Sequence, residues 1–209
     1  MDHLSYMFPS KINLTHIIKE ALNYREPKHI HDSECWYKHA GVLVPLFDKE
    51  GICKVLLTKR TNKVEHHKGQ ISFPGGSVDE EDASLEETAL REAYEEIGLL
   101  KGDVKLLGRL DDTLTLASNF VVHPFVGLIP YPYDFRISKM EVESLLMVPL
   151  NVFNSNPRPK KQEVHFEDMT YNTVTYEYNG ELIWGATARM MENFMNIIGY
   201  KLALPVGRK

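Results

Sequence analysis

The chain has 209 residues, of which 43% are hydrophobic and 25% charged, a composition typical of a folded globular protein. Its net charge of −5 argues against a general nucleic-acid-binding protein, and no segment is long and apolar enough to span a bilayer. The first residues lack the pattern of a signal peptide, and Cys35 and Cys53 suit a reducing compartment better than a disulfide scaffold. We therefore expect a cytoplasmic protein that binds neither nucleic acid nor a membrane.

The N-terminal region is expected to contain one helix, over residues 13–24, and then a polar connector with Pro27. Apolar side chains recur on one face of this helix. We divide the chain into an N-terminal helix and connector (residues 1–37) and a core (residues 38–200), within a single domain that spans residues 1–209. The apolar face consists of Ile17, Ile18, Ala21 and Leu22.

The middle of the chain is expected to form strands. Residues 42–47 and 55–58 are apolar and β-branched, and residues 48–51 between them suit a hairpin turn. Further strands are expected at residues 70–73, which lead to Gly75-Gly76, at residues 104–110, and at residues 120–129, where Pro124 is expected to break the strand.

The last third is expected to contain a helical turn over residues 141–147, a hairpin over residues 164–178 that turns at Tyr171-Asn172, and a helix over residues 186–198 that ends at Gly199. Strands interrupted by three helices predict an α+β fold. The large side chains assigned to the core or the sheet are Tyr171, Tyr176, Tyr178, Trp184, Met190 and Met191, and one of these tyrosines could stack on an adenine.

The remaining predicted helix, the second in chain order, lies between Ser84 and Gly98 and has capping residues at both ends. Ser84 is a natural N-cap with Glu87 three residues later, which is the spacing of a capping box, and Gly98 suits a left-handed terminator. One face carries an apolar stripe with a spacing of four residues. This stripe consists of Leu85, Ala89, Ala93 and Ile97.

The opposite face of this helix gathers three carboxylates. Glu92 and Glu96 are four residues apart and Glu95 lies beside them, an arrangement that destabilises a bare helix by a few tenths of a kcal/mol per pair. Arg91 is the only cation in the helix and is four residues from both Glu87 and Glu95, so it can brace the acidic face. An acidic helix alone is usually a solvated surface. A bound Mg²⁺, which takes carboxylate oxygens and substrate phosphates, is the functional alternative.

The segment from Gly76 to Leu99 resembles the Nudix box, whose second half reads Arg-Glu-aliphatic-any-Glu-Glu-any-Gly-aliphatic. The match to the second half begins at Arg91, whereas the first half departs: Asp82 replaces a glutamate, and the loop is one residue longer. The resemblance implies an α/β/α sandwich with a mixed sheet and a hydrolase of phosphoanhydrides that uses Mg²⁺ or Mn²⁺. It implies catalytic roles for Arg91, Glu92 and Glu95, and metal ligation by Glu92, Glu95 and Glu96.

A second segment, residues 56–76, resembles the additional motif of the coenzyme A pyrophosphatase branch of this family, with shorter matches at residues 40–46 and 183–188. The resemblance implies cleavage of coenzyme A and its derivatives to adenosine 3′,5′-bisphosphate and a 4′-phosphopantetheine product, by a monomer or homodimer. It implies that Arg60, His67, Lys68, Gly75 and Gly76 bind substrate. From the cluster of cations around residues 59–68, we expect Arg60 to select the 3′-phosphate.

Three questions stay open at this level. Glu65 replaces an arginine of the branch motif, which favours a Nudix hydrolase of another substrate, such as ADP-ribose or a dinucleoside polyphosphate. A non-catalytic nucleotide-binding Nudix module is the alternative of another class, although such a module would be expected to lose box carboxylates. The general base is unassigned: it could be one of the box glutamates Glu92, Glu95 and Glu96, or an acid from a distant loop, for which the candidates are Glu141, Glu143, Glu163 and Glu167.

Overall fold

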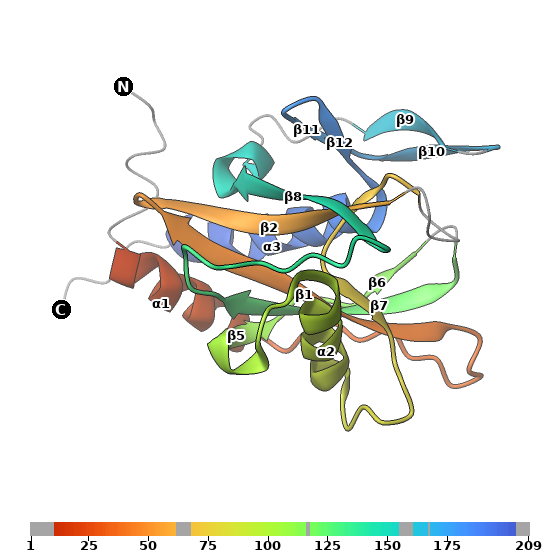
Figure 1. The fold of residues 1–209 in the computed structure, drawn as a ribbon, viewed down its shortest axis with the longest axis horizontal. Coiled ribbons are helices and arrows are strands. Elements are labelled where there is room, and N and C mark those ends of the chain that lie inside the picture. Colours follow the sequence, from red (N-terminus) through yellow and green to blue (C-terminus); the bar gives the residue numbers. More distant parts are fainter. Residues whose placement is uncertain (1–10, 62–67, 116–117, 155–160, 167, 204–209) are drawn as a thin grey trace.

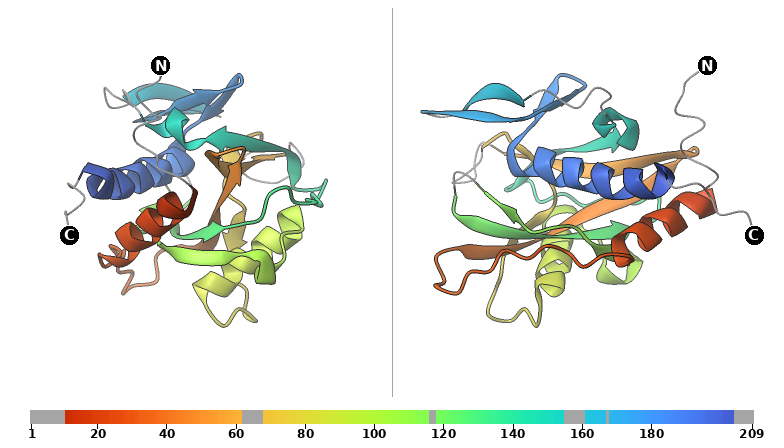
Figure 2. Two further views of the ribbon diagram at one scale, coloured as in Figure 1. Left: turned by 90° about the vertical axis from the view of Figure 1, so that its left-hand side faces the viewer. Right: turned by 180° about the vertical axis from the view of Figure 1, so that it is seen from behind.

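The computed structural model of the chain describes residues 11–61, 68–115, 118–154, 161–166 and 168–203. A mixed β-sheet lies between two layers of helices (Figures 1 and 2). Helix α2 (Leu85–Ile97) covers one face, and α1 (Lys11–Asn23) and α3 (Gly185–Ala203) pack together on the other. The predicted three-layer α/β/α sandwich is therefore confirmed. No helix in the described part of the chain is long and apolar enough to cross a membrane.

The main sheet has the strand order β3-β2-β1-β7-β5, with β4, β6 and β8 pairing beside this path. Strand β1 runs antiparallel to β2 through the expected turn at Glu50-Gly51, and parallel to β7. The strands are β1 (Lys38–Lys49), β2 (Ile52–Arg60), β3 (Ile71–Ser72), β4 (Gly75–Ser77), β5 (Lys105–Arg109), β6 (Thr113–Leu114), β7 (Phe120–Leu128) and β8 (Val142–Pro149), and short 3₁₀ turns occupy Lys101–Asp103 and Leu150–Phe153.

The apolar run in β1 is buried on both faces because helices cover both sides of the sheet. Leu43 and Phe47 pack in the cluster that includes α2, whereas Val44 and Leu46 pack in the cluster that includes α1 and α3. Gly41 lies directly under α2, and a Cβ atom at this position would clash with the backbone carbonyl of Leu85. The glycine therefore lets α2 approach the sheet closely.

Two expectations for the middle of the chain are wrong. Residues 142–149 form strand β8, which pairs antiparallel with β2, and not a helical turn. Neighbouring side chains in β8 enter opposite clusters, so its apolar run is that of a strand covered on both faces. Pro124 does not break β7. Its carbonyl accepts the N–H of Leu110, just beyond the end of β5, so the missing proline N–H falls where the ladder has already ended.

The last third also differs in detail. The first late hairpin, β9 (Lys161–Phe166) and β10 (Met169–Val174), turns between these strands and not at Tyr171-Asn172, which lie within β10. A second hairpin, β11 (Tyr176–Tyr178) and β12 (Glu181–Ile183), turns at Asn179-Gly180, where both residues have positive φ. Helix α3 continues through Gly199, since one glycine costs a helix only about 1 kcal/mol.

Candidate active site

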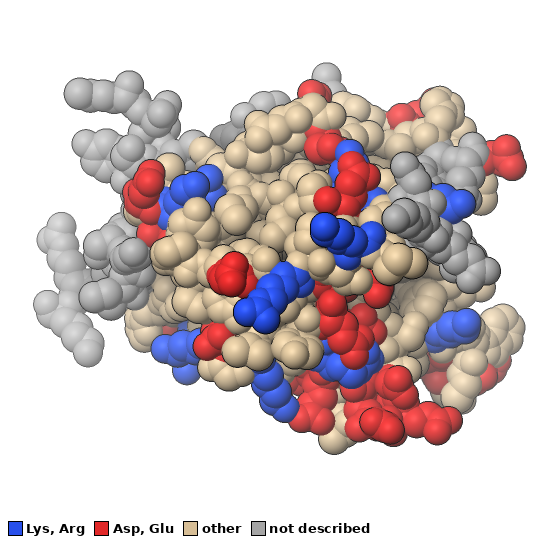
Figure 3. Space-filling model, in the orientation of Figure 1, with Lys and Arg blue, Asp and Glu red and all other residues tan. Residues whose placement is uncertain are grey.

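Helix α2 has the predicted ends. Ser84 is extended and its hydroxyl accepts the N–H of Glu87, while Gly98, at φ 69°, donates its N–H to the last turn. Ala89, Ala93 and Ile97 of the stripe are fully buried and Leu85 is partly buried, which confirms the apolar face. The opposite face and the loop before it carry the acidic surface, visible over α2 in Figure 3.

Arg91 joins this helix to the preceding loop. Its guanidinium makes two 2.9 Å hydrogen bonds to the Asp82 carboxylate, and it also donates to Glu92 (3.0 Å) and Glu95 (3.1 Å). These hydrogen bonds from Arg91, with a further one from Thr88, hold the pKa of Asp82 well below its ordinary range. Arg91 thus braces two glutamates, but its main partner is Asp82.

The expected pairing of Arg91 with Glu87 is not present. Glu87 forms an ion pair with Lys101 instead, at the start of the segment that follows the helix. Arg91 pairs with Asp82 in preference to Glu87 because its guanidinium can donate two parallel hydrogen bonds to the two oxygens of Asp82. Spacing along the helix offered both partners, and only the position of the loop selects between them.

Glu96 is the most unusual carboxylate of the site. Its side chain is 2% exposed, it accepts the Gly75 N–H, and its Oε1 atom lies 3.7 Å from Nη1 of Arg60. Its other oxygen, Oε2, has no hydrogen-bond partner among the described residues. Burial raises the pKa of Glu96 to about 8, the positive charge of Arg60 opposes this shift, and the nearby carboxylates of Glu92 and Glu141 add to it.

Glu92 lies next to Glu96 against the glycine turn, which is the bend at Pro74 together with Gly75 and Gly76 at the start of β4. A Cβ atom on Gly76 would lie 2.5 Å from the Glu92 carboxylate carbon, so a larger residue at this position would displace the carboxylate from the turn. Burial also raises the pKa of Glu92, although its hydrogen bond from Arg91 opposes the shift. Two acids whose charged forms are disfavoured therefore lie side by side at the turn.

A divalent cation fits the chemistry of these residues. Glu96 Oε2 is a buried oxygen that lacks a partner in the described part of the chain, and a cation beside it would offset the mutual repulsion of Glu92, Glu96 and Glu141. In the described part of the chain, however, no three His, Cys, Asp or Glu side chains converge on one point. Glu92 and Glu95 are turned toward Arg91, and the Glu95 side chain is 52% exposed.

The predicted substrate-binding residues are only partly gathered at this place. Arg60, Gly75 and Gly76 adjoin Glu96 and Glu92, as described above. Lys68 is exposed in the turn before β3 and does not line the cavity described below. His67 lies outside the described residues, as does Glu65.

The candidate general bases lie in different parts of the structure. Glu141 lies close enough to affect the pKa values of Glu92 and Glu96, and its carbonyl accepts the Thr61 N–H at the end of β2. Glu143 is paired with Lys59 at 3.4 Å. Glu163 is exposed on β9, and Glu167 lies outside the described residues.

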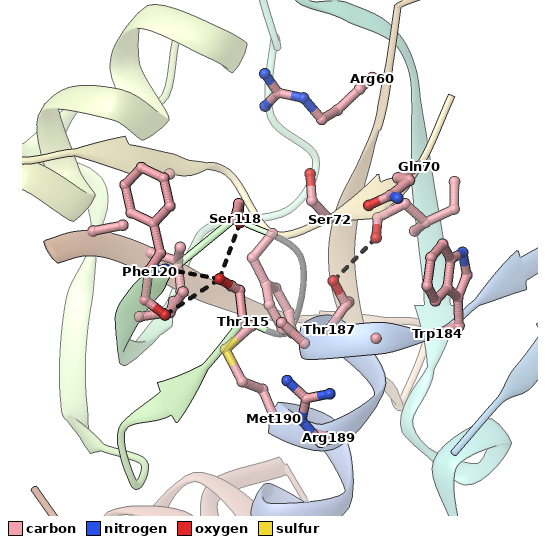
Figure 4. Close-up of a pocket in the computed structure, with 18 of the residues that line it drawn as sticks. Arg60, Gln70, Ser72, Thr115, Ser118, Phe120, Trp184, Thr187, Arg189 and Met190 are labelled. Atoms are coloured by element: carbon pink, nitrogen blue, oxygen red, sulfur yellow. Dashed lines mark hydrogen bonds between the residues drawn. The ribbon is translucent and has the colours of Figure 1, made fainter. Parts of the chain in front are cut away.

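A cavity of about 360 Å³ opens beside the glycine turn, between the sheet and the first turns of α3 (Figure 4). Met190 and Met191 are buried as expected, but Trp184, which was assigned to the core, is partly exposed and lines the cavity. Sequence reasoning missed several lining residues because they come from segments that are distant in sequence and belong to no motif. They include Thr115, Ser118, Phe120, Thr173 and Arg189.

The fold and the carboxylate helix define a Nudix-type hydrolase fold, and comparisons with known proteins identify the family. The NUDIX domain profile matches residues 37–167. The uncharacterized Nudix hydrolase NudL of Yersinia pestis (strain Pestoides F) is 35% identical over 169 residues, which cover 79% of this chain and 82% of that protein. The chain therefore belongs to the Nudix family.

Solved structures support the fold. A MutT/nudix family protein from Enterococcus faecalis superposes with a TM-score of 0.53 at 16% identity, covering 92% of this chain and 76% of that one. The Nudix hydrolase RenU from M. smegmatis gives a TM-score of 0.50 at 16% identity, covering 83% and 92%. With its family membership, the chain is a Nudix pyrophosphohydrolase that acts on nucleoside diphosphate derivatives, and Nudix hydrolases generally use divalent metal ions.

Proposed function

We propose that this enzyme hydrolyses the diphosphate of coenzyme A and its derivatives, giving adenosine 3′,5′-bisphosphate and a 4′-phosphopantetheine product. The observation that carries the proposal is the meeting of two segments that resemble the coenzyme A pyrophosphatase branch. Residues 70–73, 75–76 and 184–187 are far apart in sequence but line one cavity, and the Thr187 hydroxyl donates a 3.0 Å hydrogen bond to the Ile71 carbonyl.

The cavity adjoins the acidic helix directly. Arg60 and Gly75 line the cavity and also contact Glu96, while Gly76 lies against Glu92. A nucleotide bound there would therefore bring its diphosphate to the box carboxylates. Aromatic side chains of Phe120, Tyr171 and Trp184 line the remainder and suit a base or another apolar group.

We assign Mg²⁺ or Mn²⁺ to the acidic face, held by Glu92, Glu95 and Glu96. Such an ion supplies charge neutralisation on phosphate oxygens and lowers the pKa of bound water. The protein supplies the rest: Arg60 and the glycine turn position the diphosphate, and Arg91 orients Glu92 and Glu95. Among the candidate bases outside the box, we propose Glu141 to take the proton from water, because it interacts electrostatically with both Glu92 and Glu96 whereas Glu143 is paired with Lys59.

The test is a side-by-side turnover assay on coenzyme A and ADP-ribose with Mg²⁺, with chromatographic identification of the products. We expect coenzyme A to give adenosine 3′,5′-bisphosphate with the higher kcat/KM. Turnover of ADP-ribose without turnover of coenzyme A would establish the second candidate, which Glu65 favours. Binding without turnover of any diphosphate would instead indicate a non-catalytic module.

We also propose that residues 1–209 form a single domain in the cytoplasm. Helix α1 packs against α3 and β5, which joins the N-terminal segment to the core. Cys35 and Cys53 are free thiols, as a reducing compartment would maintain them. Proteolysis that released residues 1–37 as a separate stable fragment would contradict the single-domain assignment.

A further inference from the structure

The walls of the cavity carry a marked charge asymmetry. Arg60 and Arg189 line it, and none of the described lining residues is Asp or Glu. Figure 4 shows the two guanidinium groups on opposite sides of the lining, with the aromatic and hydroxyl side chains between them. Such a cavity favours a ligand with anionic groups at both ends and an apolar part in the middle.

The two arginines have different surroundings. Arg60 lies 3.7 Å from Glu96, so it belongs to the end of the cavity where the diphosphate meets the acidic helix. This position favours a contact of Arg60 with the scissile diphosphate over the expected contact with the 3′-phosphate. Another cation is then needed to recognise a second phosphate.

Arg189 is that cation. It projects from the second turn of α3, and its Nη2 atom donates a 2.6 Å hydrogen bond to the backbone carbonyl of Leu114. No carboxylate among the described residues lies within ion-pair distance of it. Burial lowers the pKa of Arg189, as expected for a cation that has lost water without gaining an anion.

A partly buried guanidinium without a counter-anion is unusual, because burial of an unpaired charge is costly. The Leu114 carbonyl satisfies one donor and fixes the side chain, while the planar fork leaves further N–H groups that suit phosphate oxygens. The hydroxyls of Thr115 and Ser118 line the same cavity and are hydrogen-bonded to each other at 3.0 Å. They add polar groups to this wall.

We propose that Arg189 is a specificity-determining residue that binds a phosphate monoester on the ribose of the substrate, apart from the scissile diphosphate. Resting on the proposed function, this phosphate is the 3′-phosphate of coenzyme A. Arg60 then acts on the diphosphate of every substrate, whereas Arg189 acts only on substrates that carry the additional phosphate.

The test compares kcat/KM for coenzyme A and dephospho-coenzyme A in wild-type enzyme and in Arg189→Gln. Loss of a charge-assisted contact should lower kcat/KM for coenzyme A about 10-fold to 100-fold, mainly through KM, and leave dephospho-coenzyme A within about twofold. Arg189→Lys should restore part of the preference because it keeps the charge. Lys105→Gln, which removes an exposed cation outside the cavity, is the matched control and should change neither substrate.

A second measurement separates this inference from the proposed function. Calorimetric binding of adenosine 3′,5′-bisphosphate and AMP to wild-type enzyme and Arg189→Gln requires no turnover. Tighter binding of the bisphosphate that depends on Arg189 would support the inference even if coenzyme A were not hydrolysed. Equal losses on coenzyme A and dephospho-coenzyme A, with thermal unfolding unchanged, would overturn it while leaving coenzyme A hydrolysis established. If Arg189→Gln unfolds, the comparison is made between wild-type enzyme and Arg189→Lys. If both proteins bind adenosine 3′,5′-bisphosphate no more tightly than AMP, the inference is overturned.

Discussion

Two buried carboxylates, Asp112 and Glu96, have pKa values shifted in opposite directions, although their side chains are almost equally shielded from solvent. The Asp112 side chain is 1% exposed and the Glu96 side chain 2%. Burial alone would raise the pKa of Asp112, but hydrogen bonds from His123 and the Ile30 N–H, with the charge of Arg109, outweigh it and hold the pKa below its ordinary value. For Glu96, burial prevails and the pKa rises to about 8.

The difference lies in the completeness of the partners. Asp112 Oδ1 lies 2.9 Å from His123 and accepts from Arg109 at 3.1 Å, while Oδ2 accepts from Ile30 at 3.1 Å. Glu96 accepts one backbone N–H and lies 3.7 Å from Arg60, and its other oxygen has no hydrogen-bond partner among the described residues. A buried acid with all its partners joins the connector to the sheet, whereas an incompletely satisfied one is suited to receive a ligand.

The largest expected effect is on activity. Glu96→Gln should lower Mg²⁺-dependent turnover by orders of magnitude, because it removes an anionic ligand from the acidic face. Thermal unfolding without metal should stay nearly unchanged at neutral pH, since a pKa of about 8 leaves metal-free Glu96 uncharged and the amide is uncharged as well. Glu92→Gln should lose activity similarly. Near-normal turnover of Glu96→Gln would remove it from the metal site.

The same carboxylate-to-amide change at the other site should have the reverse outcome. Asp112→Asn replaces an acceptor with an N–H donor that faces His123, Arg109 or Ile30, so it should destabilise the fold by about 3 kcal/mol. Urea unfolding measures this loss, and kcat per folded molecule should be preserved. A stable Asp112→Asn protein with poor turnover would contradict the structural role of this acid.

Arg91→Ala should have an intermediate effect on both properties. It leaves Asp82, Glu92 and Glu95 without their shared cation, so we expect a loss of about 2 kcal/mol of stability and a higher Mg²⁺ concentration for half-maximal activity. Arg91→Lys should restore little, because lysine cannot make the two parallel bonds to Asp82. Unchanged melting and unchanged Mg²⁺ dependence would show that this arginine does not brace the site.

The smallest effect is on pH dependence, and its sign differs between the two acids. Between the ordinary value of 4.5 and about 8, folded Glu96 holds a proton that the unfolded chain has released, so its contribution to stability falls as pH rises through this window. Asp112 has a lowered pKa, so its contribution is present above the unfolded value of 3.8 and is lost as pH falls through the folded pKa.

Thermal unfolding at several pH values, with and without Mg²⁺, tests this contrast. Because Mg²⁺ competes with the Glu96 proton, the increase in Tm on adding Mg²⁺ should be larger at pH 8.5 than at pH 6. Glu96→Gln should flatten this dependence and leave the loss of stability in acid unchanged. A wild-type Mg²⁺ shift that is independent of pH would contradict the raised pKa of Glu96.

Much of the fold could be predicted where the signals are local. The Ser84 cap, the Gly98 terminator and the buried stripe of α2 depend on contacts within one helix. The hairpin turn at Glu50-Gly51 likewise needs only residues that tolerate positive φ. Strand β8 could not be predicted in this way, since its conformation depends on the open edge of β2 and on helices over both faces.

In the candidate site, too, the features that depend on local sequence could be predicted and those that depend on tertiary contacts could not. The sequence by itself determined the acidic helix, its glycine turn and its family, because residues at helical spacing share a face in any context. Only the tertiary structure decided that Arg91 pairs with Asp82 and not with Glu87. It also decided that Glu96 is buried with one oxygen that has no partner among the described residues, and that Trp184 and Arg189 line the cavity. The physical reason is that burial and hydrogen-bond partners come from segments distant in sequence, and these contacts set the charge and chemistry of each side chain.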